Sequence, residues 1–191
     1  MFTGADSMIS YRLASSFLAA AAITVLGFAM ATPAQASERD RKFFSGVEGA
    51  WSGPGEIVAG KYKGTKFVCN FTGATPSEKV GMSLDGGCRV GLFTQKMQAS
   101  VEHQGRAGYR GSFMDGSDGT GLDVVGGKVE GSKVTLTLNR NDLNGAMLAR
   151  LPDDNTMNVT VSVLVDNQMV PVIGMNLKRV DRGAVGSVAN R

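Results

Sequence analysis

The chain has little of the chemistry that metal sites need. Its 191 residues include 2 cysteines and 1 histidine. These are too few for a structural zinc site of the usual kind, which takes four cysteine or histidine ligands. A haem or iron site that uses two histidines of one chain is excluded for the same reason. We therefore expect no metal site and no cofactor.

A strong charge of one sign is also lacking. The formal net charge is +3, and the 20 lysines and arginines are scattered along the chain, which argues against a nucleic-acid groove. With 5 prolines and 42 % hydrophobic residues, the composition is that of a globular protein. We expect no nucleic-acid partner.

The first 36 residues differ from the rest. An uncharged run over 13–30 follows Arg12 and precedes Ala34-Gln35-Ala36, which is the layout of a secretory signal peptide. Met8 is an alternative start, and a membrane anchor is the alternative function of the apolar run. Cleavage after Ala36 would remove 36 of the 191 residues and leave 155, enough for one domain. We expect a periplasmic or secreted protein with no stable membrane span after cleavage.

The exported part divides into three segments. Residues 37–48 form a lead-in, in which Arg39–Val47 is expected to be a short helix. We expect residues 49–180 to form the main domain and the small, polar residues 181–191 to form a flexible tail.

Cys69 and Cys88 both lie in the exported part, where disulfides form and persist. Cys69 alternates with Phe67 and Phe71, and Cys88 alternates with Val90, so both thiols are expected to face an apolar interior. A redox pair would favour a C-x-x-C motif instead. The sequence therefore predicts a structural Cys69–Cys88 disulfide.

Period-two alternation predicts strands through most of the main domain, for example over 133–140 and 156–165. The segment 142–151 is the one place where a short helix is an alternative. Glycine-containing dipeptides between these runs predict turns. We expect turns at positions 85–87, 115–116, 118–119, 126–127, 130–131 and 144–145.

This pattern predicts an all-β fold. No internal repeat is visible, which disfavours propellers and solenoids. A single antiparallel up-and-down β-barrel of about eight to ten strands is the simplest way to leave no sheet edge exposed. A barrel of this size either fills its interior with side chains or holds one small ligand.

Gly49-Ala50-Trp51, at the start of the first expected strand, resembles the opening motif of the calycin superfamily, the lipocalins and their relatives. The resemblance implies an up-and-down barrel that binds small hydrophobic ligands. It also implies that Trp51 closes one end of the barrel beneath a basic residue of the last strand, here Arg179 or its neighbour Lys178, through a cation–π contact. The alternative is that Trp51 is only the largest core residue.

Two functions follow. The first is binding of a small hydrophobic or lipid-like ligand inside the barrel. The second is a filled barrel that binds an envelope protein partner, as an envelope-integrity factor or a periplasmic protease inhibitor would. The residues expected to line or close a ligand cavity are Trp51, Tyr109, Phe113, Met157 and Met175.

Other candidate sites are weaker. The segment 118–125, preceded by Asp115, is similar to a calcium-binding nonapeptide, but it occurs once and is better explained as a hairpin loop. His103 has no nucleophile motif beside it, and no G-x-S-x-G elbow occurs. We expect that the protein is not an enzyme and that no residue is catalytic.

Overall fold

The computed structural model describes residues 33–114 and 121–180. The expected signal segment up to residue 32, the tail from 181 and the loop 115–120 lie outside these ranges. The elements are α1 (Pro33–Ser45), β1 (Gly49–Ile57), β2 (Lys66–Ala74), β3 (Gly81–Val90), β4 (Phe93–His103), the 3-10 helix η1 (Gly105–Ala107), β5 (Tyr109–Met114), β6 (Gly121–Glu130), β7 (Lys133–Arg140), β8 (Leu143–Asp153), β9 (Thr156–Val165) and β10 (Gln168–Arg179).

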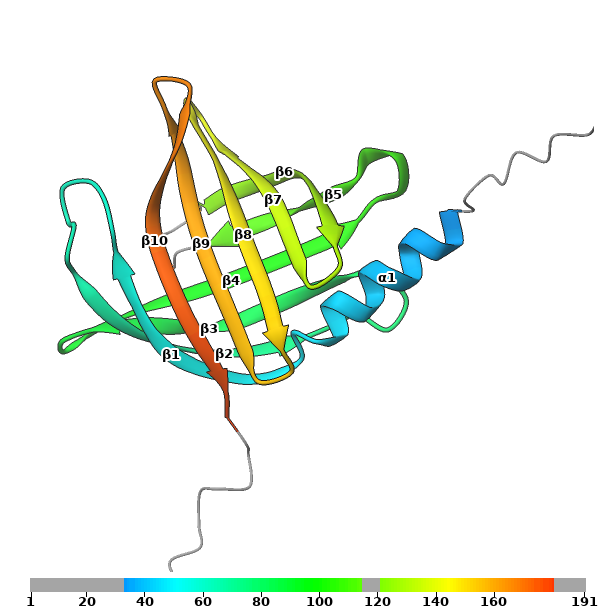
Figure 1. The fold of residues 1–191 in the computed structure, drawn as a ribbon, viewed down its shortest axis with the longest axis horizontal. Coiled ribbons are helices and arrows are strands. Elements are labelled where there is room, and N and C mark those ends of the chain that lie inside the picture. Colours follow the sequence, from blue (N-terminus) through cyan, green and yellow to red (C-terminus); the bar gives the residue numbers. More distant parts are fainter. Residues whose placement is uncertain (1–32, 115–120, 181–191) are drawn as a thin grey trace, which may run out of the picture. The chain divides into compact units, whose positions relative to one another are not determined.

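The ten strands form one closed barrel (Figure 1). Each strand pairs antiparallel with the next along the chain, and β1 pairs with β10 to complete the ring. The predicted all-β, up-and-down barrel is therefore confirmed, at the upper end of the expected strand number. Residues 143–151 of the segment 142–151 belong to strand β8, so the helical alternative for this segment is wrong.

Helix α1 is the short helix expected before the first strand, but it begins at Pro33 rather than Arg39. The expected cleavage point after Ala36 therefore falls within its first turn. The end of the helix and the residues after it pack into the barrel, since Phe43, Phe44 and Val47 are buried. The segment 43–47 thus supplies part of the core.

Three of the predicted turns are wrong. Positions 85–87 lie inside β3, 126–127 inside β6 and 144–145 inside β8, whereas 130–131 does lead into a turn. Gly86 shows the reason. A Cβ atom there would lie 2.0 Å from the carbonyl oxygen of Asn70 on the neighbouring strand, so only glycine allows the two backbones to approach this closely.

Cys69 on β2 and Cys88 on β3 are directly opposite each other and form a disulfide. Both residues are buried on the inner face of the barrel. The bond therefore fixes the pairing of two neighbouring strands from inside.

The barrel has two different ends. At the closed end lie α1, the start of β1 and the end of β10. At the open end lie the connections β1–β2, β3–β4, β7–β8 and β9–β10. The site described below occupies the open end.

Removing the disulfide should destabilise the barrel without changing its fold. The double substitution Cys69→Ala and Cys88→Ala opens a loop whose ends are 19 positions apart. The chain-entropy model assigns such a loop roughly 3 kcal/mol of unfolding free energy. Urea unfolding followed by circular dichroism measures the difference, and reduced wild-type protein should match the double variant. Equal midpoints for oxidised wild type and double variant would contradict this role.

Candidate functional site

The closed end is filled by aromatic side chains. The rings of Phe43 and Phe44 meet edge to face at 5.4 Å between centroids, and Phe44 contacts Tyr109 at 5.5 Å. Trp51 is only 1 % exposed, and its indole Nε1 donates a hydrogen bond to the carbonyl oxygen of Val47 at 2.8 Å. This end of the barrel is therefore packed core.

Arg179 holds the closed end together from outside. Its guanidinium carbon lies 4.4 Å from the centroid of the Trp51 ring, a cation–π contact. Its nitrogens donate hydrogen bonds to the carbonyl oxygens of Gly46 at 2.9 Å, of Asp154 at 2.8 Å and of Glu48. One side chain thus joins the last strand to the α1–β1 connection and to the β8–β9 turn.

Tyr109 links helix α1 to the barrel wall. Its hydroxyl donates a hydrogen bond to the Asp40 carboxylate of α1. Burial raises the pKa of the Tyr109 phenol far above its usual value, and the hydrogen bond to Asp40 and the negative charge of that carboxylate raise it further. The tyrosine therefore stays protonated and remains a donor in the folded protein.

The open end contains a cavity of about 430 Å³. Every strand of the barrel contributes to its wall. The lining residues are Ile57, Phe67, Cys88, Val90, Gln95, Met97, Phe113, Leu122, Leu138, Arg140, Leu143, Met147, Val161, Val163, Val172, Ile173 and Met175. Val90 and Leu143 in this wall are exposed at 41 % and 44 %, so the cavity opens to solvent.

The wall of the cavity is almost entirely apolar. Among the lining residues that the structure describes, only Gln95 and Arg140 have an amide or a charged side chain. Sulfur is prominent: Cys88 Sγ of the disulfide lies 3.4 Å from Met97 Sδ, and Cys69 Sγ lies 3.7 Å from Met175 Sδ. Methionine side chains adapt their shape to what they pack against, so this wall can adjust to a bound molecule.

Gly55 on β1 leaves space for the side chain of Phe67, which lines the cavity. A Cβ atom at this position would lie 2.2 Å from the ring of Phe67 and 2.9 Å from Cγ of Met175, and both of these residues line the cavity. The absence of a side chain at Gly55 therefore lets the Phe67 ring lie against the barrel wall.

The residues expected to line or close the cavity fall at different depths. Phe113 and Met175 line the large cavity. Met157 lines a smaller void of about 30 Å³ nearer the closed end, where it is fully buried. Trp51 and Tyr109 lie in the packed closed end, outside the cavity wall, with Arg179 over Trp51.

Sequence reasoning missed most of the cavity wall, including both of its polar members. Arg140 follows Val134, Leu136 and Leu138 at the same alternating phase, and these three are buried. That phase places the Arg140 side chain on the inner face of β7. This inward position could have been predicted from the sequence. The same holds for Gln95, which shares its phase on β4 with buried Val101.

Large apolar side chains are exposed at the open end of the barrel. Leu92 and Phe93, at the β3–β4 turn, are 98 % and 83 % exposed, and Tyr62 in the β1–β2 connection is 63 % exposed. Met169, at the start of β10, is also exposed at this end. Apolar surface at the open end therefore extends beyond the wall of the cavity.

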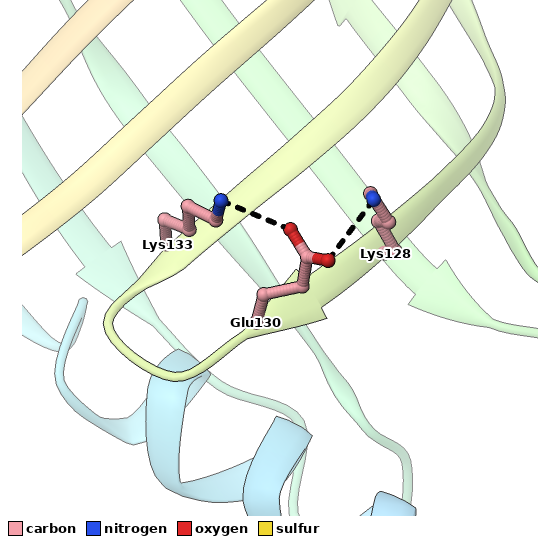
Figure 2. A network of polar contacts seen from close by, with 3 residues as sticks. All are labelled: Lys128, Glu130 and Lys133. Carbon is pink, nitrogen blue, oxygen red and sulfur yellow. Dashed lines mark hydrogen bonds and ion pairs between the residues drawn. The ribbon is translucent and has the colours of Figure 1, made fainter.

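Charged groups pair away from the cavity. At the β6–β7 hairpin, the Glu130 carboxylate contacts Lys128 at 3.0 Å and Lys133 at 3.1 Å (Figure 2). Hydrogen bonds from these two lysines lower the pKa of Glu130. The three side chains are well exposed, so they reinforce the hairpin only slightly.

Within residues 33–114 and 121–180, no group of three or more histidine, cysteine, aspartate or glutamate side chains could hold a metal ion. The calcium-like segment begins in the loop 115–120, outside the described residues. In the same part of the chain, no helix has the length and apolar character needed to cross a membrane.

His103 contacts the Tyr109 ring at 5.1 Å between centroids.

Tyr109→Phe should lower stability at neutral pH and flatten its alkaline pH dependence. The loss of a hydrogen bond to a carboxylate should cost roughly 1.5–3 kcal/mol at pH 7. Because the pKa of Tyr109 is higher in the folded protein than in the unfolded chain, its stabilising contribution is complete below pH 10 and declines above it.

Urea unfolding at pH 7 and pH 11 measures both effects. Tyr62→Phe, at an exposed tyrosine, is the matched control and should leave the stability at pH 7 unchanged. If Tyr109→Phe and wild type lose the same unfolding free energy between the two pH values, the hydrogen bond to Asp40 does not have this role.

No protein-family model matches the chain, and no curated protein matches it significantly. The ten-stranded antiparallel barrel is compatible with a calycin-like fold.

Proposed function

We propose that this protein is an exported β-barrel that binds a small hydrophobic or lipid-like molecule at its open end. The observation that supports this most strongly is the cavity of about 430 Å³, which is open to solvent and almost wholly apolar. Ligand sites in proteins have volumes of roughly 300–1,000 Å³, apolar walls and a few polar groups that fix orientation. The cavity meets all three criteria.

The driving force for binding is the removal of apolar surface from water. Each square ångström of apolar surface buried is worth about 25 cal/mol before the costs of association are subtracted. Phe67, Phe113 and Leu138 offer large apolar surfaces, and Met97 and Met175 adapt to the shape of the ligand. We expect broad selectivity for the apolar part of the ligand, since few polar groups in the wall restrict it.

The unfilled interior favours ligand binding over the alternative of an envelope interaction protein. A barrel that acted only through its outer surface would gain stability from a filled core, because filling would remove the apolar wall from water. Here the closed end is filled by Phe43, Phe44 and Trp51, whereas the open end is not. We propose binding without catalysis.

Export is supported by the disulfide, since such bonds persist in oxidising compartments. The signal-like segment that ends at Ala36 supplies the route. Protein isolated from the exported fraction of an expressing bacterium should begin at Ser37 and contain no free thiol, as intact mass spectrometry would show. An uncleaved N-terminus with two free thiols would contradict export.

Filling the cavity should abolish ligand binding. Val163 on β9 lines the cavity, whereas its neighbour Leu164 is an exposed residue outside the cavity wall. Val163→Trp should weaken the binding of the neutral fluorescent probe N-phenyl-1-naphthylamine at least tenfold, because the indole occupies the space that the probe needs. Leu164→Trp, the matched control, should bind it as wild type does.

Fluorescence titration gives both dissociation constants, and circular dichroism confirms that the variants are folded. The proposal fails if wild-type protein does not bind the probe, or if both tryptophan variants bind it as tightly as wild type.

A further inference from the structure

The Arg140 side chain occupies an unusual position. Arg140 is the last residue of β7, at the open end, and it is half-buried. It lies on the inner face of the strand, in phase with buried Leu136 and Leu138, and contributes to the cavity wall beside Leu143. Within residues 33–114 and 121–180, it is the only charged residue that lines the cavity.

The guanidinium of Arg140 has no partner among the residues that the structure describes. Asp142, two positions along the chain, is the nearest carboxylate in sequence, but it does not form an ion pair with Arg140 within 4.0 Å. The contrast with Arg179 is clear, since that guanidinium donates to three carbonyl oxygens. Arg140 therefore keeps its donors available at the edge of an apolar cavity.

The chemistry of a guanidinium defines what it would bind. Its planar, forked donors match a carboxylate or phosphate, which they can bind through two parallel hydrogen bonds. An adjoining apolar wall strengthens the attraction, because the effective dielectric constant there is lower than in water. A molecule with an anionic head at Arg140 and an apolar tail among Phe113, Met147 and Met175 would satisfy both parts of the site.

We propose that the ligand is an anionic amphiphile and that Arg140 binds its head group. This inference rests on the proposed function, and it adds the ligand class and the orientation. The head lies at the mouth of the barrel, near Arg140, and the tail extends towards the closed end. Gln95, the other polar residue of the wall, lies on β4, away from β7 in the order of strands.

Two amphiphiles with the same chain separate head-group recognition from burial of the tail. Isothermal titration calorimetry at pH 7 would compare dodecanoate with dodecan-1-ol, and acetate would report on the head group alone. Wild-type protein should favour dodecanoate over dodecanol and should bind acetate too weakly to detect. Arg140→Gln should reduce the affinity for dodecanoate about tenfold or more, as expected for hydrogen bonds to a charged group, and should leave dodecanol binding unchanged.

The matched control is Arg89→Gln. Arg89 is exposed on β3 at the same end of the barrel, next to inward-facing Cys88 but outside the cavity wall. The substitution Arg89→Gln removes the same charge without changing the cavity. Both amphiphiles should therefore bind this variant as they bind wild type. Arg140→Lys keeps the positive charge but lacks the forked donors of a guanidinium. Compared with Arg140→Gln, it should restore part of the preference for dodecanoate.

The outcomes distinguish this inference from the function on which it rests. Dodecanol binding without any preference for dodecanoate would overturn the role of Arg140 but not ligand binding in the cavity. An equal loss of dodecanoate affinity in Arg89→Gln and Arg140→Gln would also overturn it, because the effect would then come from surface charge. If neither amphiphile binds wild-type protein, both the inference and the proposed function fail.

Discussion

The pairing of the first strand with the last is the constraint on which the rest of the structure depends. Trp51 on β1 lies opposite Arg179 on β10, and the hydrogen-bonded ladder between these strands closes the sheet. Closure leaves no strand edge unpaired. It also fixes the width of the interior: eight strands enclose a space that side chains just fill, whereas ten enclose a wider one. The cavity is a consequence of this width.

The two ends of the barrel use that space differently. At the closed end, α1 and the residues after it insert Phe43, Phe44 and Val47, and hydrogen bonds from Tyr109 and Arg179 hold this segment in place. At the open end, no helix of residues 33–114 and 121–180 enters, and the inner faces of all ten strands border the cavity. The closed end is therefore packed core, while the open end contains an apolar cavity.

The sequence predicted the fold well because alternation along a strand is a local signal. In β7 the inward Val134, Leu136 and Leu138 alternate with polar residues, and the pattern identifies the buried face. Turns were harder to place. Gly86 lies within a strand because of a contact with a backbone far away in sequence, and such a contact leaves no local signature.

The cavity was predicted only in part for the same reason. Phe113 and Met175 face it, but no local pattern shows how far along each strand the packed core gives way to open space. That depth depends on how far the α1 segment reaches into the barrel. Arg140 was not predicted as part of the wall, although its alternating phase places it on the inner face of β7.

The most direct test of the central claim, that the open half of the barrel holds an apolar molecule, is native mass spectrometry of the purified protein before and after extraction with organic solvent. The account predicts that the protein carries an added mass, that extraction releases a hydrophobic compound, and that the emptied protein binds it again. A single bare mass in both samples, with no uptake of the apolar compounds tested above, would contradict it.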